Sequence, residues 1–127
     1  MEIKMVAFEP MNDIHKNEVV LLEELLTAIN NNEKIKEKFD AFFEDVKKHF
    51  AFEEELMQKY DFFAYVPHKM EHDRIIEQLE NVEKNLNNRE FLKKYFYEEF
   101  IPWLKNHIET IDTVTGGYLQ MVNLRNN

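Results

Sequence analysis

One stripe of helical period runs through residues 35 to 60, and it restricts the chain to a mainly helical fold. Its members recur at alternating spacings of four and three, which places them on one face of an α-helix. The stripe is formed by Ile35, Phe39, Phe42, Val46, His49, Glu53, Leu56 and Tyr60. Two members, His49 and Glu53, are polar. A buried carboxylate and imidazole need partners, because burying an unpaired charge costs several kcal/mol.

A second stripe follows Pro67 and again contains polar side chains. It is formed by His68, His72, Ile75, Leu79, Val82 and Leu86. Residues four apart in a helix lie side by side, with Cβ atoms within about 6 Å. The pairs His49/Glu53 and His68/His72 therefore have the spacing of metal ligands, and nitrogen and oxygen donors suit iron, zinc, manganese or nickel. Either pair alone is equally compatible with coincidence on a solvated face, and the apolar stripes around both favour a metal.

The composition indicates one all-α domain spanning residues 1–127. Eleven Phe, five Tyr and one Trp supply a core, whereas two Gly and three Pro leave few breaks, and no segment has the alternation of a strand. We expect helices over residues 12–30, 33–60, 67–86 and 89–115, preceded by an extended arm. Four helices with short links predict an up-down-up-down four-helix bundle.

Local signals define the expected helix ends. Pro10 disfavours a helical conformation at Glu9, so Asn12 or Asp13 is the expected first N-cap. Pro67 suits the first position of the third helix. At the end of the fourth helix, Gly116 and Gly117 form the expected stop.

The charge and the lack of cysteine exclude several classes of function. A formal net charge of −9 argues against binding to nucleic acid or to anionic membranes, because both require clustered Lys and Arg. With no cysteine, thiolate metal sites and cysteine nucleophiles are excluded. No signal peptide and no transmembrane segment are evident, so a cytoplasmic protein is expected.

The predicted fourth helix carries His107 and Asp112 five residues apart. In a regular α-helix this spacing sets the two side chains about 140° apart. They share a site only if the helix is widened locally, as in a π-bulge, and such bulges concentrate at functional sites. The alternative is that Asp112 is a surface acid near the helix end. Pro102, earlier in the same helix, is expected to produce a kink.

All five histidines fall on stripes that face the bundle interior, His15 being in phase with Val19, Leu22 and Ile29. With two acids they give seven candidate metal ligands: His15, His49, Glu53, His68, His72, His107 and Asp112. Seven ligands exceed what one octahedral ion accepts, so two ions are implied. Two ions offer about twelve positions; bridging carboxylates, the imidazoles and one bridging oxygen fill about eleven. One position stays open.

The segments HFAFE, HKMEH and WLKNHIETID, preceded by one His near the N-terminus, resemble the hemerythrin family, in particular the single-domain bacterial hemerythrins. The resemblance covers nearly the whole chain. It implies a non-haem di-iron centre (Fe2+/Fe3+) with an oxo or hydroxo bridge that binds O2. By position, His68, His72 and His107 would hold the saturated iron. His15 and His49 would hold the iron with the open position, and Glu53 and Asp112 would bridge the two.

The same resemblance matches Phe50, Trp103 and Leu104 to the apolar lining of the oxygen pocket, a role compatible with core packing. Two departures stand out. The family usually has Asp and Gln where Asn12 and Ile14 stand, so a contact to His15 is expected to differ. Glu18 replaces an apolar residue and lies about 60° from His15 round the helix. It either faces the oxygen pocket or bends toward the bundle end and stays hydrated.

We therefore expect reversible O2 binding, for storage, delivery or sensing, in a monomer that is not an enzyme. An unidentified reductant would restore the ferrous state, and NO is a further candidate ligand. The alternative is a di-iron oxidase or peroxide-consuming enzyme that uses Glu18 as proton donor. A structural or storage site, for example for zinc, is the third reading.

Overall fold

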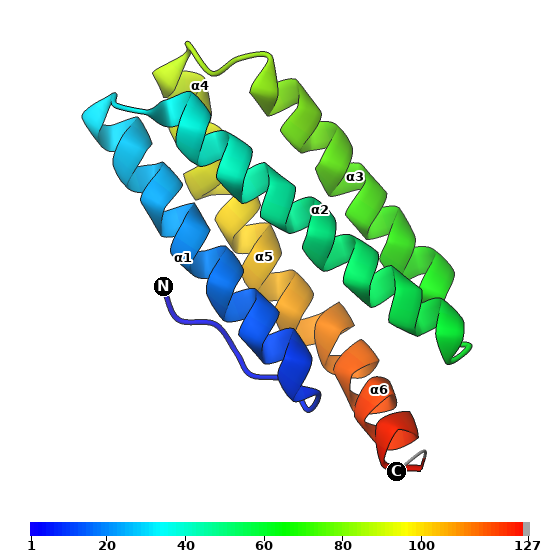
Figure 1. Ribbon diagram of the computed structural model, residues 1–127. Coiled ribbons are helices and arrows are strands. Elements are labelled where there is room, and N and C mark those ends of the chain that lie inside the picture. Colours follow the sequence, from blue (N-terminus) through cyan, green and yellow to red (C-terminus); the bar gives the residue numbers. More distant parts are fainter. Residues whose placement is uncertain (126–127) are drawn as a thin grey trace.

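The computed structural model describes residues 1–125, which contain helices and no strand. Its α-helices are α1 (Glu9–Asn31), α2 (Ile35–Lys59), α3 (Tyr65–Glu83), α4 (Arg89–Lys94), α5 (Ile101–His107) and α6 (Thr113–Arg125). Two π-helical segments, η1 (Tyr95–Phe100) and η2 (Ile108–Asp112), join α4 to α5 and α5 to α6. Figure 1 shows α4, α5 and α6 as one long helical run beside α1, α2 and α3. The predicted all-α four-helix bundle is confirmed.

The predicted stripes form the core of this bundle. Phe42 of α2 is fully buried and meets two rings of the fourth helix edge to face, Phe96 at 6.0 Å and Phe100 at 5.3 Å between centroids. Contacts of this kind contribute about 0.5–1.5 kcal/mol beyond the burial of area. Ile75 and Leu79 close the core from α3. These contacts of the apolar half of the bundle are made among apolar side chains alone.

Both prolines near helix starts lie further inside their helices than expected. The helix α1 begins at Glu9 with Pro10 in its first turn, so the expected start at Asn12 or Asp13 is wrong. The helix α3 begins at Tyr65, which makes Pro67 its third residue and not its first. The reason is the same in both cases. The first four N–H groups of a helix have no intrahelical partner, so a proline in the first turn removes nothing that the helix uses.

The fourth helix begins where the sequence predicts and ends later. Asn88 is its N-cap, and its side-chain oxygen accepts a hydrogen bond of 3.1 Å from the N–H of Phe91. The expected stop at Gly116 and Gly117 is wrong, because α6 continues to Arg125. Neither glycine adopts the positive φ of a helix-ending glycine.

The N-terminal arm explains why residue 116 has no side chain. Asn12 holds the arm by accepting a hydrogen bond from the N–H of Val6 (2.8 Å) and donating one to its carbonyl oxygen (2.9 Å). This fixes Val6 against α6, where a Cβ atom at Gly116 would lie only 3.1 Å from the Cβ of Val6. Gly116 thus allows the arm to approach the helix closely, and no such constraint acts on Gly117.

The two glycines should respond differently to alanine. We expect Gly117→Ala to raise the free energy of unfolding by about 0.5–1 kcal/mol, because glycine loses more backbone entropy in a helix than alanine does. No described atom outside its own helical turn lies within 4 Å of the added Cβ. Gly116→Ala should gain less, or lose stability, because its Cβ displaces Val6. Urea unfolding of both variants measures the difference, and equal gains would contradict the close packing of the arm.

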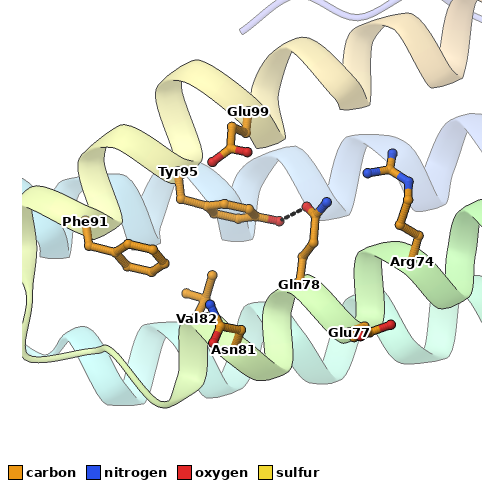
Figure 2. A pocket seen from close by; sticks show the side chains of 8 residues that line it. All are labelled: Arg74, Glu77, Gln78, Asn81, Val82, Phe91, Tyr95 and Glu99. Carbon is orange, nitrogen blue, oxygen red and sulfur yellow. Dashed lines mark hydrogen bonds between the residues drawn. The ribbon is translucent and has the colours of Figure 1, made fainter.

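The segment η1 precedes Pro102, the residue expected to distort this helix. Here the N–H of Ile101 donates to the carbonyl of Phe96, five residues back, and the wider turn relieves the crowding that proline causes in the turn before it. Tyr95 in η1 points toward α3 and donates a hydrogen bond of 2.9 Å to Gln78 (Figure 2). Both residues line a pocket of about 420 Å3. Its lining consists of Arg74, Glu77, Gln78, Asn81, Val82, Phe91, Tyr95 and Glu99.

Candidate metal centre

Seven polar side chains from all four helices of the bundle meet in its interior, and each is at most 3% exposed. They are His15 from α1, His49 and Glu53 from α2, His68 and His72 from α3, His107 from α5 and Asp112 from η2. These are the seven candidate ligands of the sequence analysis, and the fold brings all of them together. An array of this kind is costly unless the groups neutralise one another or bind a cation.

The segment η2 is what turns Asp112 inward. Oδ1 of Asp112 lies 3.2 Å from Nε2 of His107 although the two residues are five apart. The predicted π-type distortion between them is confirmed. Asp112 is fully buried, so its interpretation as a surface acid is wrong.

The seven side chains form two groups. Within each group, the atoms that could bind a metal all lie within 4.8 Å of one another. One group contains His68, His72 and His107, and the other contains His15, His49, Glu53 and Asp112. Each carboxylate reaches both groups. Oε1 of Glu53 lies 3.2 Å from Nε2 of His68 and of His72, whereas Oε2 lies 2.6 Å from Nε2 of His49.

Asp112 repeats this arrangement on the other side of the site. Its Oδ1 lies 3.2 Å from Nε2 of both His68 and His107, and its Oδ2 lies 3.0 Å from Nε2 of His15. Glu53 and Asp112 therefore stand between the same two histidine groups, with one oxygen turned to each. Each carboxylate is therefore placed where it would be able to contact two ions at once.

The spacing of these atoms fits cation binding better than hydrogen bonding. Most facing atoms are 3.0–3.2 Å apart, yet within residues 1–125 no hydrogen-bond partner is found for Nε2 of His15, His68, His72 or His107, or for either oxygen of Asp112. Neighbouring ligands of an octahedral ion with bonds of about 2.1 Å are about 3.0 Å apart. Because both the donor types and their separations match, the residues fit a pair of metal ions.

The charges of the site shift the pKa values of its members in opposite directions. Burial alone would lower the pKa of His15, but close contact with Asp112 and Glu53 outweighs burial and raises it to about 9. The pKa of His68 rises to about 9 in the same way, against burial and because of the same two carboxylates. Burial works to raise the pKa of Glu53, but the surrounding imidazoles hold it well below its usual range.

The imidazole nitrogens that face away from the centre differ in their partners. Nδ1 of His49 lies 2.8 Å from Oε1 of Glu18, and Nδ1 of His72 lies 2.9 Å from Oε2 of Glu54. Nδ1 of His68 lies 2.8 Å from the hydroxyl of Thr115. Partners in these positions fix the orientation of a metal-binding imidazole.

Aromatic rings cover two of the imidazoles. Phe50 stacks on His72 with centroids 3.9 Å apart and planes 2° apart. Trp103 stacks on His107 at 4.6 Å and donates a hydrogen bond of 3.1 Å to Glu71. Leu104, the third residue expected to line the pocket, is buried in the core.

Glu18 and Asn12, the two unusual residues near His15, are both buried. Glu18 is 1% exposed, so the alternative in which it bends toward the bundle end and stays hydrated is wrong. Asn12 is engaged with Val6, and no hydrogen-bond partner of His15 Nδ1 is found in the described part of the chain.

Two contacts of the site were missed in the sequence. Thr115 is three residues after Asp112 and therefore lies on the same face of the helix. This spacing is a signal from which Thr115 could have been predicted to lie near the candidate ligands. Glu54 directly follows a ligand candidate and lies about 100° away from it round α2. No periodic signal marks that position, because it faces α3 rather than the core.

Comparison with known proteins agrees with this geometry. Residues 6–119 match the family model of the hemerythrin HHE cation binding domain. A bacteriohemerythrin of Aquifex aeolicus is 36% identical over 114 residues, which cover 86% of this chain and 87% of that protein. A bacteriohemerythrin of Methylococcus capsulatus is 30% identical over 108 residues, or 83% of this chain and 82% of that protein.

A helical bundle with a buried set of nitrogen and oxygen donors, matched over most of its length by a cation-binding domain, defines the class. The chain belongs to the hemerythrin family. Both relatives are named bacteriohemerythrins.

Proposed function

We propose that this protein binds O2 reversibly at a non-haem di-iron centre held by the seven buried side chains. The observation that carries the proposal is the arrangement of Glu53 and Asp112, each of which turns one oxygen to each of two histidine groups. The matching family model describes a cation binding domain, and both relatives are bacteriohemerythrins, which supports a metal centre. Iron and O2 are proposed from the resemblance to the hemerythrins.

The two groups offer different numbers of donors. Three imidazoles (His68, His72 and His107) with one oxygen from each carboxylate supply five ligands, whereas His15 and His49 with the other two oxygens supply four. An oxo or hydroxo bridge between the two ions would fill one further position on each, which completes six ligands in the first group and leaves one position open in the second, where a small ligand would enter. Two ferrous ions held by these residues would supply the redox chemistry that reversible O2 binding requires.

The residues around the centre would keep this exchange reversible. Phe50 stacks on His72 and also contacts His49, with ring centroids 5.2 Å apart, and Trp103 stacks on His107. With the buried Leu104, these side chains would exclude water, which would otherwise supply protons to a reduced ligand. We propose that they line the oxygen pocket. The outer partners Glu18, Glu54 and Thr115 hold three imidazoles with Nε2 turned inward.

Storage, delivery and sensing of O2 all suit such a centre, and NO is a second proposed ligand. No helix within residues 1–125 combines the length and apolar character needed to cross a membrane. We propose a cytoplasmic monomer that forms one domain, with a separate electron donor as its reductant.

The alternative, an oxidase or peroxide-consuming enzyme, depends on Glu18 as a proton donor to the bound ligand. The contact that Glu18 makes is with Nδ1 of His49, the nitrogen that faces away from the histidine and carboxylate cluster. No observation favours proton delivery from there to the ligand position, so O2 binding remains the proposal.

The test is metal content followed by an absorption spectrum. Protein loaded anaerobically with Fe2+ should contain two irons per chain, remain nearly colourless without O2, and gain a visible ligand-to-iron charge-transfer band in air. The band should disappear under argon and return in air over repeated cycles. A colourless zinc protein would contradict the proposal, and so would a band that forms once and never reverses.

A further inference from the structure

Glu18 is a buried carboxylate with an unusual position beside the candidate centre. It is 1% exposed, lies three residues after His15 on α1, and meets Nδ1 of His49 on α2 at 2.8 Å. The two other outer partners are less extreme. Glu54 keeps 21% of its side chain exposed, and Thr115 carries no charge.

A carboxylate with so little exposure is expensive, since a well-packed apolar side chain at this place would avoid the desolvation cost. After Glu18, the buried face of α1 continues with Val19, Leu22 and Leu25, and Asp45 of α2 is a second acid close enough to interact with it. None of these side chains stabilises a negative charge. The charge of Glu18 therefore acts on the ring that it contacts. With Nε2 of His49 bound to a metal ion, the proton of the neutral ring is on Nδ1, where it is donated to Glu18.

We propose that Glu18 is a positioning residue for one metal ion only, the ion held by His15 and His49. It fixes the ring of His49 with Nε2 inward and, through its charge, makes this imidazole a stronger donor. This inference rests on the proposed two-metal function.

The other group has its own carboxylate, which provides an internal comparison. Glu54 contacts Nδ1 of His72 at 2.9 Å, and His72 belongs to the group with His68 and His107. Glu18 and Glu54 therefore support different ions. The more deeply buried carboxylate supports the group with fewer protein ligands, where loss of one good donor has the greater effect on affinity.

The experiment is a calorimetric titration of the metal-free chain with Co2+, comparing Glu18→Leu, Glu18→Gln and Glu54→Gln with wild type. Glu44→Gln is the matched control, because it removes one exposed acid from the same helix as His49. Wild type should bind two ions in two resolved steps. Glu18→Leu should weaken one step by about 10- to 100-fold and leave the other within about 3-fold.

Glu54→Gln should weaken the other step, and Glu44→Gln neither. Glu18→Gln should fall between wild type and Glu18→Leu, because its amide oxygen can still accept the proton of Nδ1 without supplying charge. In the zinc-loaded protein, 15N NMR should show the Nδ1–H signal of His49 displaced in Glu18→Leu and retained in Glu18→Gln. A general loss of folding stability would not produce this pattern.

Two results would overturn the inference while leaving the proposed function intact: two unchanged steps in Glu18→Leu, or equal weakening of both steps. If Glu18→Leu does not fold, the step that Glu18→Gln weakens and its NMR signal decide the matter. Fewer than two ions in the wild-type protein would instead refute the two-metal function itself, so the two failures are distinguishable.

Discussion

Replacing Glu53 by alanine is expected to leave a folded helical protein that has lost most of its metal from both positions. Oε1 of Glu53 faces His68 and His72, and Oε2 faces His49, so one substitution removes a ligand from each ion. The affinity should fall by more than the roughly 10- to 100-fold that loss of an outer partner causes. The fold should persist, because the apolar half of the bundle packs without these groups.

His107 gives the contrasting result. It faces Asp112 Oδ1 only, so His107→Ala should release mainly the ion of its own group. Metal analysis of Fe2+-loaded Glu53→Ala, His107→Ala and the exposed-site control Glu55→Ala distinguishes these outcomes, with circular dichroism to confirm helicity. Two irons per chain retained in either ligand variant would refute the assigned roles.

Removing the metal should reverse the dependence of stability on pH between about 6.5 and 9. With no ion bound, folding raises the pKa of His15 and His68 from 6.5 to about 9. A group whose pKa is raised on folding contributes stability below its unfolded pKa and loses it as the pH rises through its folded value. The metal-free protein should therefore become less stable over this interval, by about 3 kcal/mol for one such imidazole.

The two imidazoles share the same carboxylates, so their contributions are not additive. In the metal-loaded protein the same nitrogens must be unprotonated to act as ligands, and a higher pH removes the proton that competes with the ion. Its stability should stay level or rise from pH 6.5 to 9. Guanidinium unfolding of chelated and loaded protein at several pH values measures both slopes, and parallel slopes would contradict the assignment of His15 and His68 as ligands.

The sequence by itself determined the bundle and the membership of the cluster. Helical period is a property of the backbone. A stripe such as Phe39, Phe42, Val46 and His49 therefore shows which residues point into the bundle, even when the residues that they contact there are unknown. The same local geometry predicted the π segment, since His107 and Asp112 cannot share a site five residues apart without it. These conclusions required only the angle per residue and the cost of burying charge.

The helix ends depended on tertiary contacts instead. Gly116 and Gly117 predicted a helix end, because glycine destabilises an isolated helix. In the structure the N-terminal arm packs against Gly116, and the helix continues past both glycines. Propensities of this kind amount to about 1 kcal/mol and are readily overridden by packing.

The partners of the imidazoles were decided by the tertiary structure alone. Helical geometry placed Glu18 about 60° from His15 round α1, but it did not determine how deeply Glu18 is buried or which nitrogen of His49 it contacts. Which ring a side chain contacts depends on how far one helix is translated and rotated against the next. That is fixed only when the cores of all four helices interlock, because no single helix carries the information.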